Sequence, residues 1–153
     1  MKRAEYATTL ADLFAVPIPA ESRTYKPVSH RELAHLTDQA IKNIGFEVDR
    51  AKFTCMNSGN IATGMYTIKG VQDDDMQLMI GWQNSYNKQV SLKFAIGSQV
   101  FICSNGCVSG SIGAFKRKHQ GDVQIFTPQM IGSYISNAQQ SFNLLIEDKA
   151  LMK

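Results

Sequence analysis

The sequence predicts an α+β fold, an antiparallel β-meander of about five or six strands flanked by an N-terminal helix and a long C-terminal helix. Apolar residues recur at helical spacing towards both ends of the 153-residue chain. Between Phe46 and about Cys103 they alternate with polar residues, and short turn-forming runs divide this stretch. We therefore expect two parts, an extended N-terminal arm over residues 1–28 and a single α+β domain over residues 29–153.

The extended arm is predicted from its prolines. Pro17, Pro19 and Pro27 lie in a stretch that has no sustained apolar period, and proline removes a backbone donor from helices and sheets. Because an arm of this kind often packs on a neighbouring subunit, we expect the protein to form a homo-oligomer.

The first helix is predicted to begin at Ser29. The run Ser29-His30-Arg31-Glu32 has the form of a capping box, in which the serine hydroxyl accepts a hydrogen bond from a backbone amide that has no partner within the helix. Residues 33–44 then carry apolar side chains at helical spacing, and Gly45 suits the left-handed conformation that ends a helix. One face of this helix should belong to the core.

The central strands are each predicted to have one apolar face. The apolar residues at alternate positions of residues 76–83 and 90–97 are Met76, Leu78, Ile80, Trp82, Val90, Leu92, Phe94 and Ile96. Because Trp82 shares a face with Ile80, we expect its ring in the core and not against a nucleobase. Turns are expected at residues 57–60, 70–75 and 84–88, a short strand at 100–102, and a loop over the Gly- and Ser-rich residues 104–113.

The last predicted element is one long amphipathic helix. Thr127 and Pro128 have the order of an N-cap and a first-turn proline, and apolar residues repeat at helical spacing from Ile131 to Leu145. We expect this helix to run from residue 127 to the C-terminus.

Composition indicates a protein of the cytoplasm. The chain is 44% hydrophobic and 19% charged, and no apolar run approaches the length of a membrane span. Residues 1–10 lack the apolar core and cleavage site of a secretory signal. Three cysteines give no even disulfide framework, so reduced thiols are the simpler interpretation.

Charge is distributed unevenly along the chain. All 13 acidic residues lie outside Met76–Gly121, so the net charge of +3 conceals a segment that carries only positive charge. The basic residues of this segment are Lys88, Lys93, Lys116, Arg117 and Lys118. We expect these cations to share a surface free of carboxylates, which would attract a polyanion such as nucleic acid.

Seven residues of this segment are candidates for contacting nucleic acid. Tyr86 lies among turn-forming residues, where we expect an exposed ring that can stack on a base. The candidates for phosphate contacts are Lys88, Lys93, Lys116, Arg117, Lys118 and His119. If residues 116–119 are extended, alternate side chains face opposite ways and only two of them reach one strand of nucleic acid. A solvated loop is the alternative interpretation of this basic run.

Other polar residues are assigned to structure and not to chemistry. Those expected to stabilise turns are Asn84, Ser85, Asn87, Asn105 and Gly106. Cys55, Cys103, Cys107 and His119 lack the paired close spacings of a structural zinc site. Asp73, Asp74 and Asp75 would suit a metal-dependent nuclease, but consecutive acids at a hairpin tip are usually solvated. We predict no catalytic residue, no metal and no cofactor.

Four short motifs resemble a family of phage- and plasmid-borne proteins of unknown function. They are Y-K-P-V-S-H at residues 25–30, G-W-x-N-S-Y-[ND]-K at 81–88, V-F-[IV]-C-[SD]-N at 100–105 and a basic K-H-x-G-[ND] run within 117–122. The resemblance covers roughly residues 25–125, and neither the N-terminal arm nor Cys107 is part of the pattern. It implies a mobile-element setting, in particular a bacteriophage and hence the cytoplasm of a bacterial host, without defining an activity.

These observations together predict a phage-encoded, non-enzymatic nucleic-acid-binding protein that acts on single-stranded DNA in replication or recombination. The expected topology resembles the core of ring-forming strand-annealing proteins, although a shared fold does not fix function. The alternative is a phage interaction protein that inhibits a host defence factor, because an acid-depleted segment also suits an acidic protein partner.

Overall fold

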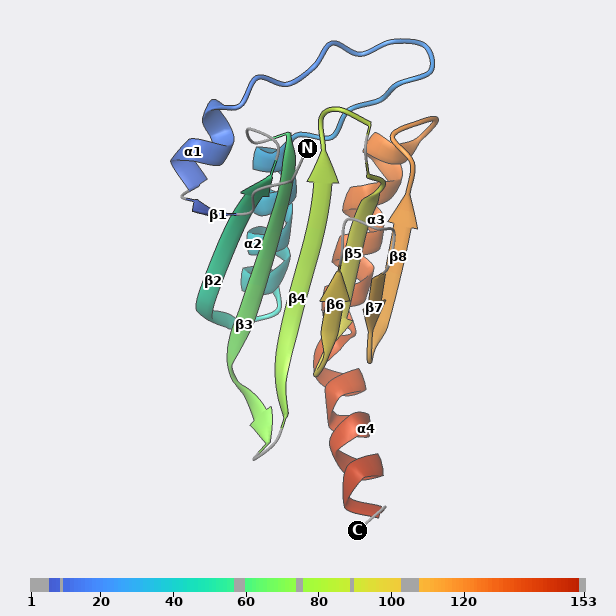
Figure 1. The fold of residues 1–153 in the computed structure, drawn as a ribbon. Coiled ribbons are helices and arrows are strands. Elements are labelled where there is room, and N and C mark those ends of the chain that lie inside the picture. Colours follow the sequence, from blue (N-terminus) through green and yellow to red (C-terminus); the bar gives the residue numbers. More distant parts are fainter. Residues whose placement is uncertain are drawn as a thin grey trace.

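A six-stranded antiparallel sheet organises the chain (Figure 1). The computed structural model describes residues 6–8, 10–56, 60–73, 76–88, 90–102 and 108–151. In spatial order the strands are β1 (Tyr6–Thr8), β2 (Glu47–Met56), β3 (Ile61–Asp73), β4 (Met76–Ser85), β5 (Leu92–Gly97) and β8 (Gly113–Arg117). Each strand pairs antiparallel with its neighbour, which confirms the predicted α+β fold with a β-meander.

The two faces of the sheet are covered differently (Figure 1). Helices α2 (His30–Asn43) and α3 (Val123–Ser136) lie behind the sheet, and α4 (Ala138–Leu151) continues below the ends of β5 and β8. On the other face a small hairpin, β6 (Val100–Ile102) and β7 (Val108–Gly110), lies over β4, β5 and β8. Gly81 makes room for it, because a Cβ there would lie 3.1 Å from the side chains of Val100 and Ile102.

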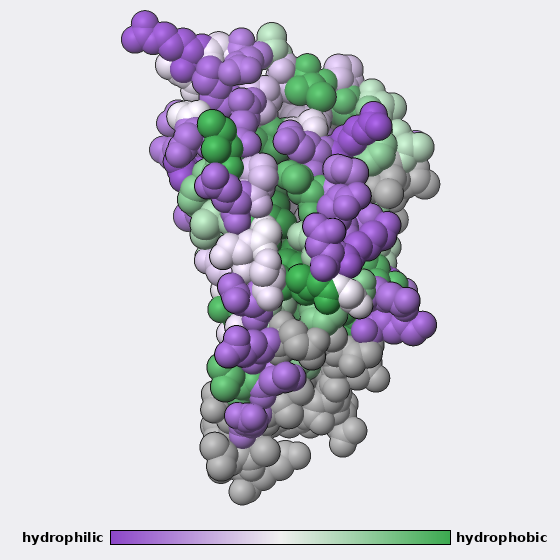
Figure 2. Space-filling model, turned by 180° about the vertical axis from the view of Figure 1, so that it is seen from behind, coloured by the Kyte–Doolittle hydropathy of each residue, from purple (hydrophilic) through white to green (hydrophobic). Residues whose placement is uncertain are grey.

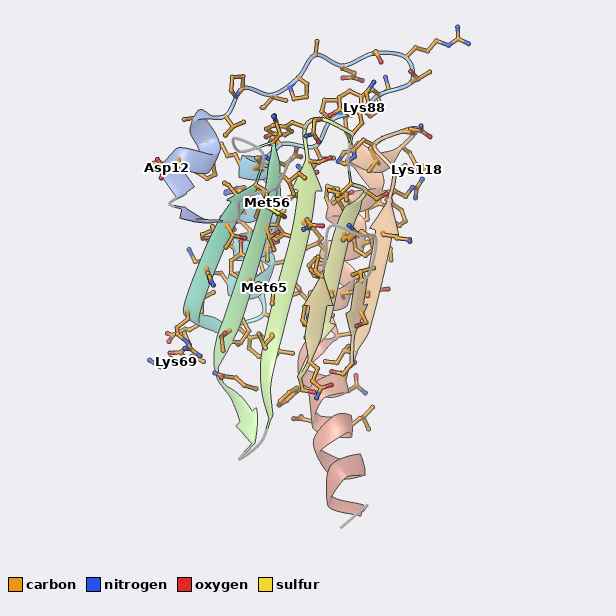
Figure 3. All side chains as sticks on the ribbon, viewed as in Figure 1. Asp12, Met56, Met65, Lys69, Lys88 and Lys118 are labelled. Atoms are coloured by element: carbon orange, nitrogen blue, oxygen red, sulfur yellow. The ribbon has the colours of Figure 1, made fainter. Side chains whose placement is uncertain are left out.

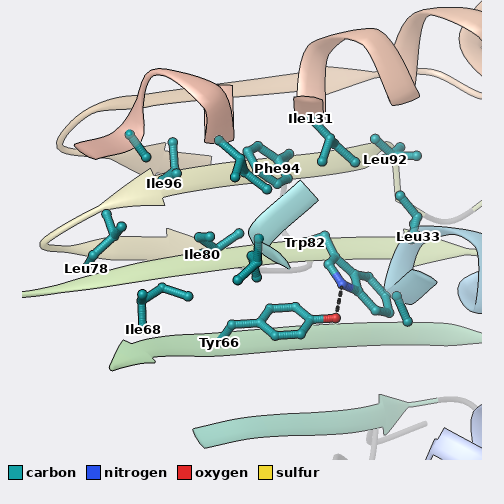
Figure 4. Close-up of a cluster of buried hydrophobic side chains, with 14 of the residues drawn as sticks. Leu33, Tyr66, Ile68, Leu78, Ile80, Trp82, Leu92, Phe94, Ile96 and Ile131 are labelled. Carbon is teal, nitrogen blue, oxygen red and sulfur yellow. Dashed lines mark hydrogen bonds between the residues drawn. The ribbon is translucent and has the colours of Figure 1, made fainter. Parts of the chain in front are cut away.

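The main core lies between the sheet and the helices (Figure 4). The register pairs Trp82 with Phe94 and Ile80 with Ile96, and all four side chains are fully buried. Trp82 Nε1 donates a hydrogen bond of 3.2 Å to the hydroxyl of Tyr66, so the indole nitrogen is satisfied within the core. The predicted apolar faces and the core position of Trp82 are confirmed.

Helix α2 begins and ends where the sequence predicts. The Ser29 hydroxyl accepts a hydrogen bond of 2.9 Å from the backbone amide of Glu32, and Gly45 adopts a left-handed φ of 81°. Leu33 and Ile41 are fully buried on its inner face. Seen from the side of the helices, the surface shows hydrophobic side chains between two bands of polar ones (Figure 2).

The single long C-terminal helix is a wrong prediction. Two helices of 14 residues, α3 and α4, meet at Asn137, whose side chain donates to the Ser133 carbonyl. Thr127 lies inside α3 and is not its N-cap. Its hydroxyl donates a hydrogen bond of 2.7 Å to the carbonyl of Val123, one turn earlier in the same helix. The helix starts after Asp122, where Gly121 turns the chain with a φ of 60°.

The N-terminal arm belongs to the fold of its own chain. Residues 6–8 form strand β1 against β2, whereas Leu10–Ala15 form helix α1 and are therefore not extended. Tyr25 and Val28 are buried, and the Lys26 amide donates 2.7 Å to the His119 carbonyl. The arm therefore does not need a neighbouring subunit to pack against, and the homo-oligomer remains a prediction.

Two further expectations concern the loop at residues 104–113 and membrane-spanning helices. The predicted loop over residues 104–113 contains strand β7 and the first residue of β8, while residues 103–107 lie outside the described part of the chain. Among the residues that the structure describes, no helix has the length and hydropathy needed to cross a bilayer.

Candidate anion-binding site

Three segments meet at one end of the sheet. β4 ends at Ser85 and β5 begins at Leu92, while Arg117 at the end of β8 lies opposite Leu92 in the register. The β4–β5 connection and the β8–α3 connection therefore emerge at the same end, and the backbone bond between Lys26 and His119 ties the N-terminal segment to them. Figure 3 shows Lys88 and Lys118 at this end and Lys69 at the other.

These segments enclose a pocket of about 370 Å³. It is lined by Thr24, Tyr25, Lys88, Val90, Ser91, Lys118, His119 and Gln120. Lys88 and Lys118 are exposed, whereas Tyr25, Val90 and His119 are buried walls. None of the lining residues carries a carboxylate, so the two ammonium groups give the pocket a positive field. We refer to it below as the lysine pocket.

Lys88 is held at the pocket by unusual backbone geometry. Its φ is 62°, in the left-handed region that few residues other than glycine adopt. Its ammonium lies 4.8 Å from the centroid of the Tyr25 ring, a cation–π contact that keeps the charge over one wall of the pocket.

A buried amide, that of Asn84, holds the walls of the lysine pocket together. Asn84 is fully buried near the end of β4, and its Nδ2 donates 2.5 Å to the carbonyl of Val28. The same nitrogen lies 3.1 Å from Nδ1 of His30, and Oδ1 lies 2.7 Å from Nε2 of His119. One side chain thus links the N-terminal segment, the start of α2 and the β8–α3 connection.

The Asn84 contacts also define which ring nitrogens carry protons. The Val28 carbonyl can only accept, so it fixes the amide nitrogen on that side, and the same nitrogen donates to an unprotonated Nδ1 of His30. His119 must then donate from Nε2 to Oδ1. Burial lowers the pKa of His119 from 6.5 to about 4, so this ring is neutral at pH 7.

Two residues predicted to contact nucleic acid, Tyr86 and His119, are buried, so the expected exposure of the Tyr86 ring is wrong. Tyr86 is only 7% exposed, its ring stacks 3.8 Å from that of His30, and its hydroxyl accepts a 2.7 Å bond from the His30 amide. Burial raises the pKa of Tyr86, so its phenol stays neutral. His119 is 5% exposed and bonded to Asn84, so it cannot present a charge to a phosphate at neutral pH.

The five cations of the acid-free segment do not share one surface, which corrects a further expectation. Lys93 is 1% exposed, and its ammonium donates 3.0 Å to Oε1 of Gln83. Lys116 lies opposite Lys93 on the hairpin side of the sheet, where it is exposed. Arg117 points to the other side, pairs with Asp122 and lies 4.2 Å over the Phe126 ring. Of the five, only Lys88 and Lys118 line the lysine pocket.

The residues predicted to stabilise turns have mixed outcomes. The Ser85 hydroxyl donates 2.9 Å to the Val90 carbonyl and so closes the β4–β5 connection, as predicted. Asn84 is instead a strand residue with long-range partners, so its turn role is wrong. Asn87 lies in the β4–β5 connection, and Asn105 and Gly106 fall outside the described residues.

No metal site emerges from the residues that the structure describes, none of which form a group of three or more potential ligands. Cys55 is a buried free thiol in β2. Asp73 ends β3, whereas Asp74, Asp75, Cys103 and Cys107 lie outside the described ranges, so the nuclease alternative is not tested by their geometry.

No family model matches the chain, and no curated protein or solved structure is detectably similar to it. The resemblance to phage- and plasmid-borne proteins therefore remains a prediction from the four motifs. These motifs nevertheless contribute Tyr25, Asn84, Lys88 and Lys118 to one end of the sheet. Thr24, Ser91 and Gln120 were not predicted, because nothing in the sequence distinguishes them from ordinary surface residues.

Proposed function

We propose that the protein binds single-stranded DNA without catalysing a reaction on it, in the replication or recombination of a phage. The observation that carries this proposal is the lysine pocket, in which Lys88 and Lys118 come from separate segments and no lining residue is acidic. Lysine ammonium groups neutralise backbone phosphates and release the counterions that surround them.

The shape of the site favours a single strand over a duplex. The pocket is a depression of about 370 Å³ with buried walls at one end of the sheet, and Lys88 and Lys118 both line it. A duplex is a stiff rod with a persistence length of about 50 nm, so it cannot bend a phosphate into a depression of this size at low cost. A flexible single strand can place a phosphate there.

The proposal is tested by titrating a labelled oligonucleotide, single- or double-stranded, across a salt series. We expect tighter binding of the single strand, with an affinity that falls steeply as salt rises. Replacing both Lys88 and Lys118 by alanine should reduce the log–log salt slope by about 0.7, because the pocket holds one phosphate and each phosphate neutralised on a single strand contributes about 0.7.

A matched control is Lys69→Ala. Lys69 is exposed, lies at the other end of the molecule and is 3.8 Å from Glu47 (Figure 3). This variant should retain the full salt slope. If the unmodified protein fails to bind at low salt, the proposal is wrong, and nuclease-resistant capture of a host protein would instead favour the interaction-protein alternative.

A further inference from the structure

We propose that the lysine pocket takes a phosphomonoester, the terminal phosphate of a DNA strand, in preference to the phosphodiesters inside the strand. This inference rests on the proposed function and adds to it the part of the nucleic acid that is recognised. It depends on three features of the pocket: its small volume, its charge and its neutral donors.

The small volume of the pocket favours a chain end. Tyr25, Val90 and His119 are between 5% and 7% exposed and form buried walls of the pocket. The volume of about 370 Å³ is near the small end of ligand pockets, which span roughly 300–1,000 Å³. It therefore suits a terminal group and not a run of nucleotides.

The charge of the pocket matches a phosphomonoester. A phosphomonoester carries between about 1.5 and 2 negative charges at pH 7, whereas each phosphodiester carries one. Lys88 and Lys118 supply two positive charges, and His119 adds none because it is neutral. The nearby acids are engaged elsewhere: Glu21 pairs with Lys26 at 2.8 Å, and Asp122 pairs with Arg117. Neither acid lines the pocket.

Neutral donors are available for the remaining phosphate oxygens. Thr24, Ser91 and Gln120 all line the pocket, and their side chains carry two hydroxyls and one amide. A terminal phosphate has three non-bridging oxygens and an internal one has two, so the terminal group gains more from this set.

The experiment compares three single-stranded oligonucleotides of one sequence, with a 5′-phosphate, a 3′-phosphate or hydroxyls at both ends. We expect one phosphorylated form to bind about tenfold more tightly than the hydroxyl form, because one extra charge-assisted contact is worth about that factor. Lys88→Ala combined with Lys118→Ala should abolish this preference, and Lys69→Ala should keep it. Circular dichroism melting of each variant confirms that it is folded.

A free nucleoside monophosphate, added as a competitor, shows whether the phosphomonoester that binds belongs to a strand end or to a free nucleotide. Competition at concentrations near those of the phosphorylated oligonucleotide would identify the free nucleotide as the ligand, and much weaker competition would identify the strand end; both outcomes support a phosphomonoester site. Equal, salt-dependent binding of all three oligonucleotides would overturn the inference and leave the proposed function intact. If no oligonucleotide binds at low salt and the free monophosphate does not bind either, both are wrong.

Discussion

Two cavities of nearly equal size differ in chemistry. The lysine pocket encloses about 370 Å³, and a second cavity of about 320 Å³ lies between α1, α2 and the strands β2 and β3. The second cavity, which we refer to as the aromatic pocket, is lined by Phe14, Arg31, Ala34, His35, Asp38, Val48, Ala51, Phe53 and Tyr66. Acidic and basic side chains both line the aromatic pocket, whereas the charged side chains that line the lysine pocket are lysines.

The two pockets differ in the acids that line them: Asp38 lines the aromatic pocket, and no acid lines the lysine pocket. In the aromatic pocket Arg31 lies 5.3 Å over the Phe14 ring with Asp38 in the same lining, and Asp38 itself pairs with Lys42 at 2.9 Å. In the lysine pocket no acid lies among the lining residues. An anion is therefore expected in the lysine pocket and not in the aromatic pocket.

The largest difference between the two pockets should be the loss of folding stability when a buried polar group beside each pocket is removed. Asn84→Leu leaves the Val28 carbonyl and two histidine nitrogens without their partner, so we expect a loss of about 3 kcal/mol in the free energy of unfolding. Tyr66→Phe, beside the aromatic pocket, removes one bond from Trp82 and should cost about 1 kcal/mol. Urea unfolding measures both. A loss below that of Tyr66→Phe would show that Asn84 does not hold the lysine pocket together.

The pH dependence of stability should follow from the buried imidazole of His119. The folded ring stays neutral down to a pKa of about 4, whereas the unfolded ring takes up a proton near 6.5. The unfolded state therefore binds more protons between these values, so the contribution is complete above pH 6.5 and is lost as the pH falls towards 4. Between pH 7 and pH 5 this single group should remove about 2 kcal/mol of stability.

His119→Gln isolates that contribution, because glutamine keeps a donor for Asn84 Oδ1 and cannot titrate. Urea unfolding at pH 7 and pH 5 should show a smaller acid loss for this variant by about the same 2 kcal/mol. The account of His119 fails if the variant and the unmodified protein lose stability in parallel.

The smallest expected effect is the change in DNA affinity when one positive charge is removed from each pocket. Lys118→Ala should weaken binding of single-stranded DNA about fivefold, since one partly exposed ionic contact is worth roughly 1 kcal/mol. Arg31→Ala in the aromatic pocket should leave the affinity unchanged. Fluorescence anisotropy at fixed low salt gives both values. Equal losses in the two variants would mean that general positive charge, and not the lysine pocket, attracts the DNA.

The sequence predicts the sheet well because burial repeats along each strand. The alternation of Leu78, Ile80 and Trp82 identifies the face that packs against the helices, and all three side chains are fully buried there. Serine and glycine at the ends of α2 act through bonds within a few residues, so local sequence is enough to place them.

The site is predicted only in part, because distant segments decide its burial. Tyr86 follows a turn-like run of amides, yet its exposure is set by His30 at the start of α2. Lys93 lies between buried residues of β5, so the alternation predicts that its side chain faces solvent. In the structure both faces of β5 are covered, and Lys93 is buried. The ion pair between Arg117 and Asp122 could have been predicted from the sequence, because Asp122 lies one residue beyond the acid-free segment.

The central claim is that Lys88 and Lys118 form one anion-binding site at the end of the sheet. The most direct measurement is an NMR titration of the labelled protein with a single-stranded oligonucleotide, followed through the backbone amides. We predict that the largest shifts cluster at Lys88, Ser91, Lys118 and Gln120 and disappear as salt is added. Shifts that cluster instead around Arg31 and Phe53, or no shifts at low salt, would contradict it.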